Sequence, residues 1–122
     1  MKKLTSLQLA RLAAGLALSK NGFDIKLLNL KDVSSVCDYF VIASGNADVH
    51  VKSIARAVLT GLAEAGYKPF YTEGTNEGNW VVLDCFDVII HVFHEPTRQF
   101  YQLEKLWGDV PVEELSDEPA GK

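Results

Sequence analysis

The sequence predicts a single-domain α/β fold in which a mixed sheet of about five strands is flanked by helices. Two observations predict it. Amphipathic helical segments and short apolar strands follow one another in the order α-β-β-α-β-β-β-α. The 122 residues are enough for one hydrophobic core but too few for two. We expect the folded domain to occupy residues 1–108 and the Pro- and acid-rich tail at residues 109–122 to be disordered.

The first half of the chain predicts a helix, two strands and a second helix. Thr5 followed by Gln8 is a capping-box start. The second strand has a continuous apolar run, which is typical of a strand buried on both faces. Gly66 ends the second helix, which carries a broad apolar stripe. The expected elements are a helix from Thr5 to Asn21-Gly22, strands at residues 25–30 and 38–45, and a helix at residues 47–65.

The second half predicts a short strand, a hairpin and a last helix. Pro69 places the short strand near a sheet edge, because proline cannot donate to the strand ladder. In the last helix, Phe100, Leu103 and Trp107 would share one face. The expected elements are a strand at residues 68–74, two hairpin strands within residues 79–95 that divide at Cys85 to Asp87, and a helix at residues 96–107.

Charge is unevenly distributed along the chain, whose net charge is −4. Residues 1–56 hold eight basic and four acidic residues, residues 57–108 hold three and seven, and the tail holds one and five. An acidic half favours a basic partner and opposes binding to nucleic acid, whose phosphates need clustered Lys and Arg. The alternative is that the charges are simply solvated on different faces of the domain.

A nucleotidyltransferase or nucleotide-binding domain is the main enzymatic alternative. Ser44-Gly45 ends a strand before a helix, where a phosphate could bind. Two-metal phosphoryl transfer needs closely spaced carboxylates, usually Asp-x-Asp on a strand. The sequence contains no Asp/Glu-x-Asp/Glu triplet, and Asp84 and Asp87 lie three residues apart across an expected turn. We therefore expect no catalytic residue and no cofactor.

The histidines and cysteines do not indicate a metal site. Three or four ligands would have to converge from separate elements; the candidates are His50, His91, His94 and Cys85. Cys37 and Cys85 belong to no Cys-x-x-Cys motif, so we expect two reduced thiols, with a disulfide as the alternative. No segment has the 18 or more apolar residues of a membrane span, and the N-terminal apolar stretch lacks a signal-peptide cleavage site. We expect a cytoplasmic protein without a membrane partner.

Trp80 is the main candidate for a protein–protein contact. Alternation places Trp80 and Asp84 on the same face of the first hairpin strand. Tryptophan is a favoured interface anchor because it offers a large apolar area with few rotamers to freeze; the alternative is that Trp80 covers one end of the core. Tyr101 lies outside the apolar face of the last helix, near Arg98 and Glu104 at helical spacings. These three residues form either a mixed contact surface or a solvated face.

Six motifs, in order along the chain, resemble the ribosomal silencing factor family, which is also called Iojap-like. They run from the second strand to Trp107 and cover most of the predicted domain, and the resemblance extends back to the first helix. The motifs are DYFVIASG (residues 38–45), HV-x-x-IA (50–55), EG (73–74), WVVLD (80–84), DVIIHVF (87–93) and RQFYQLEKLW (98–107).

The resemblance implies a non-catalytic factor whose fold is like that of nucleotidyltransferases without their catalytic carboxylates. Members of the family bind the large ribosomal subunit through its protein uL-fourteen, block association with the small subunit and reduce translation when nutrients are scarce. A role in large-subunit assembly and a homodimeric free state are also associated with the family. The implied contact residues are Trp80, Asp84 and Asp87, with Glu73, Arg98, Tyr101 and Glu104 as further candidates.

One residue departs from the family pattern. The family usually has Gly before the second aspartate of the hairpin, where this chain has Phe86. We expect either a different turn or a strained Phe86 at positive φ, which costs about 1–2 kcal/mol. In the strained case, the ring would pack on the partner or on a second copy of the chain.

Overall fold

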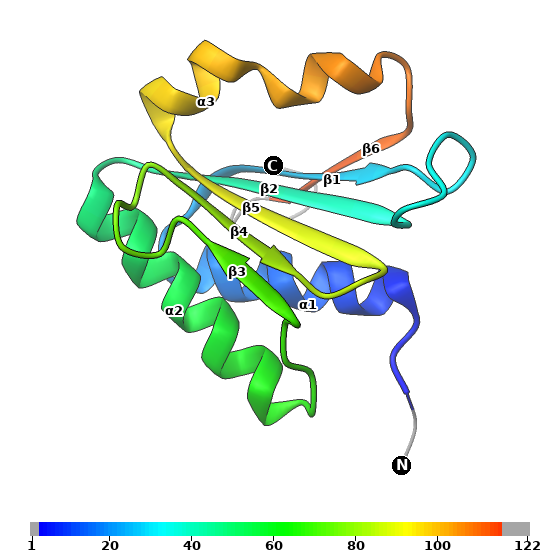
Figure 1. Cartoon of the computed structure of the whole chain (residues 1–122), viewed down its shortest axis with the longest axis horizontal. Helices are drawn as coiled ribbons and strands as arrows, with labels where there is room; N and C mark the ends of the chain where they lie inside the picture. The colour runs from blue at the N-terminus through cyan, green and yellow to red at the C-terminus, as the bar shows by residue number, and fades with distance from the viewer. Residues whose placement is uncertain (1–2, 116–122) are drawn as a thin grey trace, which may run out of the picture.

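The computed structural model describes residues 3–115 and confirms the predicted order of helices and strands (Figure 1). The helices are α1 (Ser6–Ser19), α2 (Asp48–Glu64) and α3 (Glu95–Tyr101), followed by the 3-10 helix η1 (Leu103–Trp107). The strands are β1 (Phe23–Asn29), β2 (Tyr39–Gly45), β3 (Tyr71–Glu73), β4 (Trp80–Asp84), β5 (Val88–His94) and β6 (Val112–Leu115).

The strands form one mixed sheet in the order β3-β4-β5-β2-β1-β6. β2 and β5 run parallel, from Tyr39 opposite Val88 to Gly45 opposite His94. The other neighbouring strands are antiparallel. β2 lies inside the sheet and is buried along almost its whole length, as its apolar run predicts. A mixed α/β domain is therefore confirmed, with six strands where about five were expected.

The sixth strand comes from the segment that composition assigned to a disordered tail. β6 pairs antiparallel with β1, with Val112 opposite Leu28. Glu113 accepts two hydrogen bonds from Arg11 of α1, at 2.9 and 3.0 Å. The prediction of disorder was wrong for the four residues of β6, because composition does not register that β1 offers an unpaired edge to any nearby strand. Residues 116–122 lie outside the described part of the chain.

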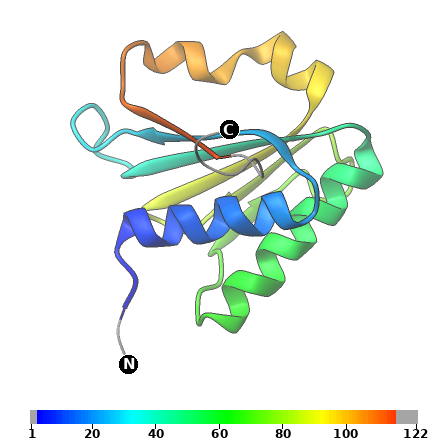
Figure 2. The ribbon, with the colours of Figure 1, turned by 180° about the vertical axis from the view of Figure 1, so that it is seen from behind.

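α1 and α2 cover one face of the sheet, and α1 lies along the sheet in the view from behind (Figures 1 and 2). α1 begins with the predicted capping box: the hydroxyl of Thr5 accepts from the backbone N–H of Gln8 at 3.1 Å, and the Gln8 side chain accepts from the backbone N–H of Thr5 at 2.9 Å. The buried side of α1 is mostly small, so the helix can lie close to its neighbours. Its buried residues are Leu9, Ala10, Ala13, Ala14 and Ala17.

The predicted last helix is broken at Gln102. This residue has a left-handed backbone (φ 49°) that ends α3 before η1 begins. The prediction of one helix over residues 96–107 was therefore wrong. Its expected apolar face does not form either, because Leu103 is buried whereas Phe100 is 79% exposed. α3 and η1 lie across the face of the sheet opposite α1 and α2 (Figure 1), and α3 contacts β5 and β2.

Gly74 and Gly66 provide a matched test of how the β3–β4 loop is held. Both have positive φ, 81° and 90°, but an added Cβ at Gly74 would collide with the backbone carbonyl of Trp80, whereas one at Gly66 would meet nothing within 4 Å. We expect Gly66→Ala to lower the free energy of unfolding by about 1 kcal/mol, from the backbone conformation alone. Gly74→Ala adds the collision and should lower it by about 2–4 kcal/mol. Urea unfolding followed by circular dichroism measures both, and equal losses would contradict this account of the loop.

Candidate functional site

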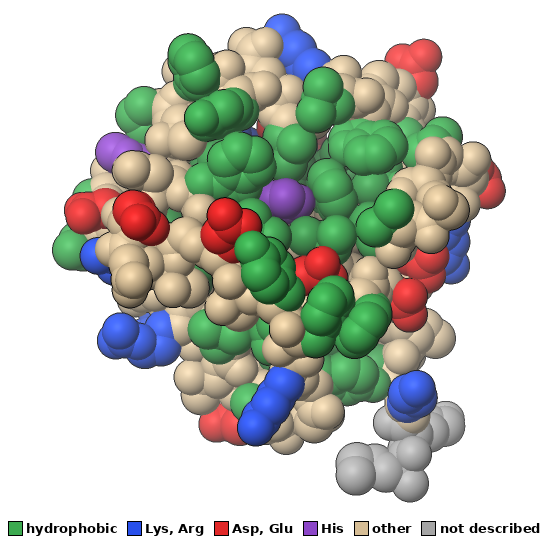
Figure 3. Space-filling view, viewed as in Figure 1, with side chains coloured by type: hydrophobic (Ala, Val, Ile, Leu, Met, Phe, Trp, Pro, Cys, Tyr) green, Lys and Arg blue, Asp and Glu red, His purple; other side chains and the backbone are tan. Residues whose placement is uncertain are grey.

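The sheet surface turned away from α1 and α2 is only partly covered by α3 and η1. Strand register places Glu73, Val82 and His91 side by side on this surface. Hydrophobic side chains gather there around a histidine, with acidic side chains among and beside them (Figure 3). An apolar patch of this kind with a polar border is typical of a protein interaction site. We call this region the open face; it consists of Phe40, Tyr71, Glu73, Trp80, Val82, Asp84, Ile89 and His91.

Trp80 begins β4 and is half-buried in an aromatic cluster. Its ring stacks on Phe93 with centroids 4.8 Å apart and meets the ring of Tyr101 at 5.0 Å. Its indole N–H donates a hydrogen bond to Nδ1 of His91 at 3.1 Å. Trp80 therefore packs on the core through Phe93 and keeps part of its surface on the open face, and its role as a partner contact stays a prediction.

His91 is the buried centre of the open face. It is 6% exposed, and its ring centroid lies 4.5 Å from that of Phe40. Burial lowers the pKa of His91 to about 4, so the imidazole is neutral at pH 7. Because Nδ1 accepts from Trp80, the proton resides on Nε2, which has no acceptor among residues 3–115. From the sequence, His91 is either a metal ligand or, as is more usual for a lone strand histidine, a hydrogen-bonded residue at the core edge; its partner Trp80 was not identified, because only the hairpin register connects the two.

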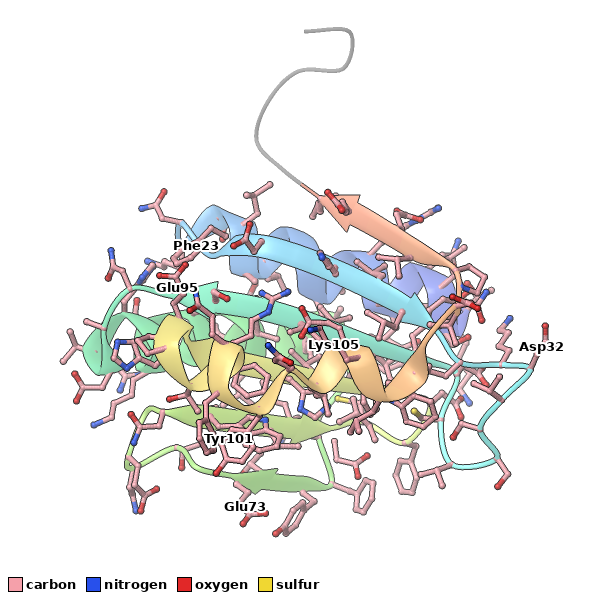
Figure 4. All side chains as sticks on the ribbon, turned by 90° about the horizontal axis from the view of Figure 1, so that it is seen from above. Phe23, Asp32, Glu73, Glu95, Tyr101 and Lys105 are labelled. Carbon is pink, nitrogen blue, oxygen red and sulfur yellow. The ribbon has the colours of Figure 1, made fainter. Side chains whose placement is uncertain are left out.

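An acidic group surrounds the β4–β5 turn and continues along the edge strand. Asp84 is half-buried and Asp87 is exposed, and the backbone N–H of Asp38 donates to the carbonyl oxygen of Asp87 at 2.8 Å. Burial, and then the negative charges of Asp38, Asp84 and Asp87, raise the pKa of Cys37 to about 11. These carboxylates therefore lie close enough to act on one thiol, and Glu73 extends the group at the outer edge of the sheet (Figure 4). Sequence analysis did not identify Asp38 as a member of this acidic group, because only the parallel pairing of β2 with β5 brings it to the β4–β5 turn.

Phe86 has a positive φ of 71°, which corresponds to the strained one of the two expected alternatives. The carboxylate of Asp84 accepts from the backbone N–H of Phe86 at 2.9 Å and supports the turn. The ring of Phe86 stacks on Phe70 with centroids 3.9 Å apart. The expected strained turn is confirmed, and the ring packs on Phe70 of its own chain while remaining exposed beside the acidic group.

Arg98 and Glu104 bind each other rather than facing outward from the open face. Arg98 is 7% exposed. Its guanidinium donates to a Glu104 carboxylate oxygen at 2.9 and 3.1 Å, to the Asp24 carbonyl oxygen at 2.7 Å, and to the Ser44 hydroxyl at 2.8 Å. Burial raises the pKa of Glu104, but hydrogen bonds, first of all from Arg98, outweigh this effect and leave that pKa below its usual value. Arg98 thus fastens α3 to β1 and β2.

Tyr101 is the predicted contact residue of the last segment that reaches the open face. It is 53% exposed, and it lies on the side of α3 that faces β4 and β3 (Figure 4). The helical spacing that grouped Tyr101 with Glu104 does not apply, because the α-helix ends at Gln102 between them.

The two parts of the enzymatic alternative lie at opposite ends of the strands. Ser44 pairs with Phe93 of β5, whereas Asp84 pairs with Ile89 of the same strand. Four residues along a strand correspond to about 13 Å, much more than the roughly 4 Å between the ions of a two-metal site. The Ser44 hydroxyl is buried and already accepts from Arg98. Ser44-Gly45 and the hairpin carboxylates therefore do not converge on one phosphate.

The two thiols and the candidate metal ligands do not gather at one metal site in the described part of the chain. Cys37 and Cys85 are free, and burial raises the pKa of Cys85 to about 11, which keeps the thiol protonated at pH 7. No three His, Cys, Asp or Glu side chains come together as a metal site over residues 3–115. Within the same range, no helix has the length and apolar character needed to cross a membrane.

Comparison with known proteins agrees with the six motifs. Residues 3–122 match the family described as "Ribosomal silencing factor during starvation". The chain belongs to the ribosomal silencing factor family. Ribosomal silencing factor RsfS of Bacillus subtilis (strain 168) is 42% identical over 105 residues, which are 86% of this chain and 89% of that protein.

The fold of this ribosomal silencing factor family member also occurs in a solved structure. A crystal structure of a Chromobacterium violaceum protein has a TM-score of 0.84 and 29% identity, covering 96% of this chain and 92% of that one. A mouse relative, named "Mitochondrial assembly of ribosomal large subunit protein 1", is 29% identical over 91 residues, which are 72% of this chain and 40% of that protein.

Replacing Arg98 should show that it anchors the fold. Arg98→Ala leaves the partly buried Glu104 carboxylate unpaired, and we expect the free energy of unfolding to fall by about 3 kcal/mol. Arg11→Ala is the matched control, because it removes an ion pair with Glu113 whose side chains are 54% and 41% exposed, and it should change stability little. Urea unfolding compares the two, and similar losses would show that Arg98 does not anchor α3.

The pKa of His91 predicts a specific loss of stability in mild acid. Between its usual value near 6.5 and the folded value of about 4, the unfolded chain binds a proton that the folded chain does not. The titration of His91 therefore costs the fold little above about pH 6.5, and it lowers the free energy of unfolding by about 2–3 kcal/mol on acidification to pH 4.5. Urea unfolding at both pH values should show a smaller loss for His91→Phe than for the unmodified protein. Equal losses would mean that His91 does not titrate in this range.

Proposed function

We propose that this chain binds the large ribosomal subunit through its protein uL-fourteen and sterically prevents the small subunit from joining, which reduces translation in nutrient limitation. The observation that carries the proposal is the open face, where the half-buried Trp80 lies within an apolar surface bordered by carboxylates. Membership of the family supports a ribosomal partner, and the name of the mouse relative supports the large subunit. A contribution to assembly of the large subunit is compatible with the same surface.

The proposed contact combines apolar burial with charge. Trp80 and Tyr101 supply rigid aromatic area, which contributes most when it is desolvated at the centre of an interface. Asp84, Asp87 and Glu73 would meet Lys and Arg side chains of a basic ribosomal protein, and bidentate arginine contacts would set the orientation. Arg98 belongs to the proposal only as the residue that holds α3, and therefore Tyr101, in place.

Steric obstruction requires no turnover, and we propose that the protein has no catalytic residue and no cofactor. The separation of Ser44 from Asp84 along the strands supports this view. Such a factor would act in the cytoplasm, without a membrane partner and without reading a nucleic-acid sequence. When it is free, we expect a homodimer, since an exposed aromatic surface favours self-association; light scattering after gel filtration measures this state.

Trp80→Ala should weaken binding to isolated large subunits by at least about 1–2 kcal/mol, which is roughly five- to thirtyfold, as expected for an interface anchor. Co-sedimentation with separated large and small subunits measures the affinity, and binding is expected for the large subunit only. Val49→Ala is the control, because Val49 is an exposed apolar residue of α2, on the covered side of the sheet. It should bind normally.

Two outcomes would contradict the proposal in different ways. Unchanged binding by a folded Trp80→Ala protein would remove Trp80 from the contact surface. Saturable binding of a nucleoside triphosphate with Mg²⁺ in calorimetry, lost in an Asp84→Ala, Asp87→Ala variant, would favour the nucleotidyltransferase alternative.

A further inference from the structure

The hydrogen bond between Trp80 and His91 joins an exposed surface to the buried layer beneath it. The indole N–H of Trp80 donates to Nδ1 of His91 at 3.1 Å, and within residues 3–115 this is the indole's one hydrogen bond. Phe93 stacks on the indole, and Tyr101 lies beside it at a tilted angle. Aromatic contacts leave a ring free to slide or turn, whereas the directional hydrogen bond defines which edge points inward.

For stability alone, histidine is an unfavourable choice at this position. Nε2 of His91 carries a proton that meets no acceptor in the described part of the chain, and an unpaired buried donor costs more than a typical hydrogen bond contributes. The neighbours of His91 on this face of the sheet are apolar: Ile42 on β2, Val82 on β4 and the ring of Phe40. An apolar residue would satisfy all of these contacts, so folding does not explain why a histidine is present.

We propose that His91 is a positioning residue, which holds the indole of Trp80 in the orientation that the ribosomal partner binds. The inference rests on the proposed function, in which Trp80 is the anchor of the contact. His91 itself lies beneath the surface and does not touch the partner. Without its acceptor, the indole N–H would turn toward water, and binding would then have to immobilise the ring. Freezing one such side chain corresponds to about three- to tenfold in affinity.

Two substitutions separate positioning from stability. His91→Leu removes the acceptor and the unpaired donor together, so the melting temperature at pH 7 should stay the same or rise while large-subunit binding weakens about three- to tenfold. His91→Asn keeps an acceptor close to the place of Nδ1 but fills less space, so it should melt lower and yet bind better than His91→Leu. His94→Leu is the control, since His94 lies at the end of the same strand. It should change neither the melting temperature nor large-subunit binding.

A measurement without ribosomes tests the contact itself. Hydrogen exchange of the Trp80 indole N–H, followed by NMR and assigned with Trp80→Phe, should be slow in the unmodified protein and in His91→Asn, and fast in His91→Leu. This result would show that His91 positions the indole even if the unmodified protein failed to bind large subunits. Failure to bind would overturn only the proposed function.

The proposal is overturned by any of three results. The first is that His91→Leu binds large subunits as tightly as the unmodified protein. The second is that His91→Leu loses binding and stability together or fails to fold. The third is that the indole N–H of Trp80 still exchanges slowly in His91→Leu. A folded His91→Asn protein that binds no better than His91→Leu would equally show that the acceptor is not what matters.

Discussion

The parallel pairing of β2 with β5 determines where the side chains of this domain meet. It is the one parallel contact of the described sheet, and it joins the first half of the chain to the second. Parallel strands begin at the same edge of a sheet, so Asp38, which precedes β2, comes to Asp87, which precedes β5. An antiparallel pairing would have sent Asp38 to the opposite end of β5, beside His94. The concentration of carboxylates at the hairpin turn therefore depends on strand direction more than on any local motif.

The two faces of the sheet are covered to different extents, and this asymmetry creates the surface available to a partner. α1 and α2 are long and cover one face, and the buried side of α1 is lined largely by alanine, so α1 can lie close along the sheet. α3 is short because Gln102 ends it, and Arg98 holds the short helix over β1 and β2. Tyr71, Val82 and other outward-facing residues of β3 and β4 consequently remain uncovered. Apolar residues left uncovered on a sheet favour aggregation unless another molecule covers them.

Sequence reasoning succeeded where the deciding interactions are local. Alternation along β4 predicted that Trp80 and Asp84 share a face, because this depends on a few consecutive residues. For Phe86, the family resemblance left two alternatives, a different turn or a strained residue, and the positive φ corresponds to the second. Sequence reasoning failed where contact with a distant segment of the chain determines the local structure. β6 forms only because β1 offers a free edge, which amino-acid composition cannot show.

The last helix illustrates the same limit. A helical periodicity carried through Gln102 groups Arg98, Tyr101 and Glu104 on one surface. The left-handed backbone at Gln102 ends the α-helix, and Glu104 pairs with the buried Arg98 while Tyr101 remains exposed on α3. The residue type at this position does not predict the end of the helix, because glutamine is an ordinary helix former. Tertiary hydrogen bonds of Arg98 to Asp24 and Ser44 hold the segment in this arrangement.

Two features that lower stability lie on or beside the open face. Phe86 has a backbone conformation that favours glycine, and His91 buries a donor without an acceptor in residues 3–115. The strain at Phe86 is partly offset by the Asp84 carboxylate and by Phe70, whereas the donor of His91 has no such compensation. The side covered by α1 and α2 follows the ordinary rules of a dry, apolar core with a capped helix. Local choices that oppose stability are expected where a surface serves a second purpose. Positive φ also occurs at Asn21, Asp24 and Gln102, away from the hairpin turn, so backbone strain does not by itself distinguish the open face. The buried donor of His91 beneath Trp80 is the feature that supports a second purpose for this face of the sheet.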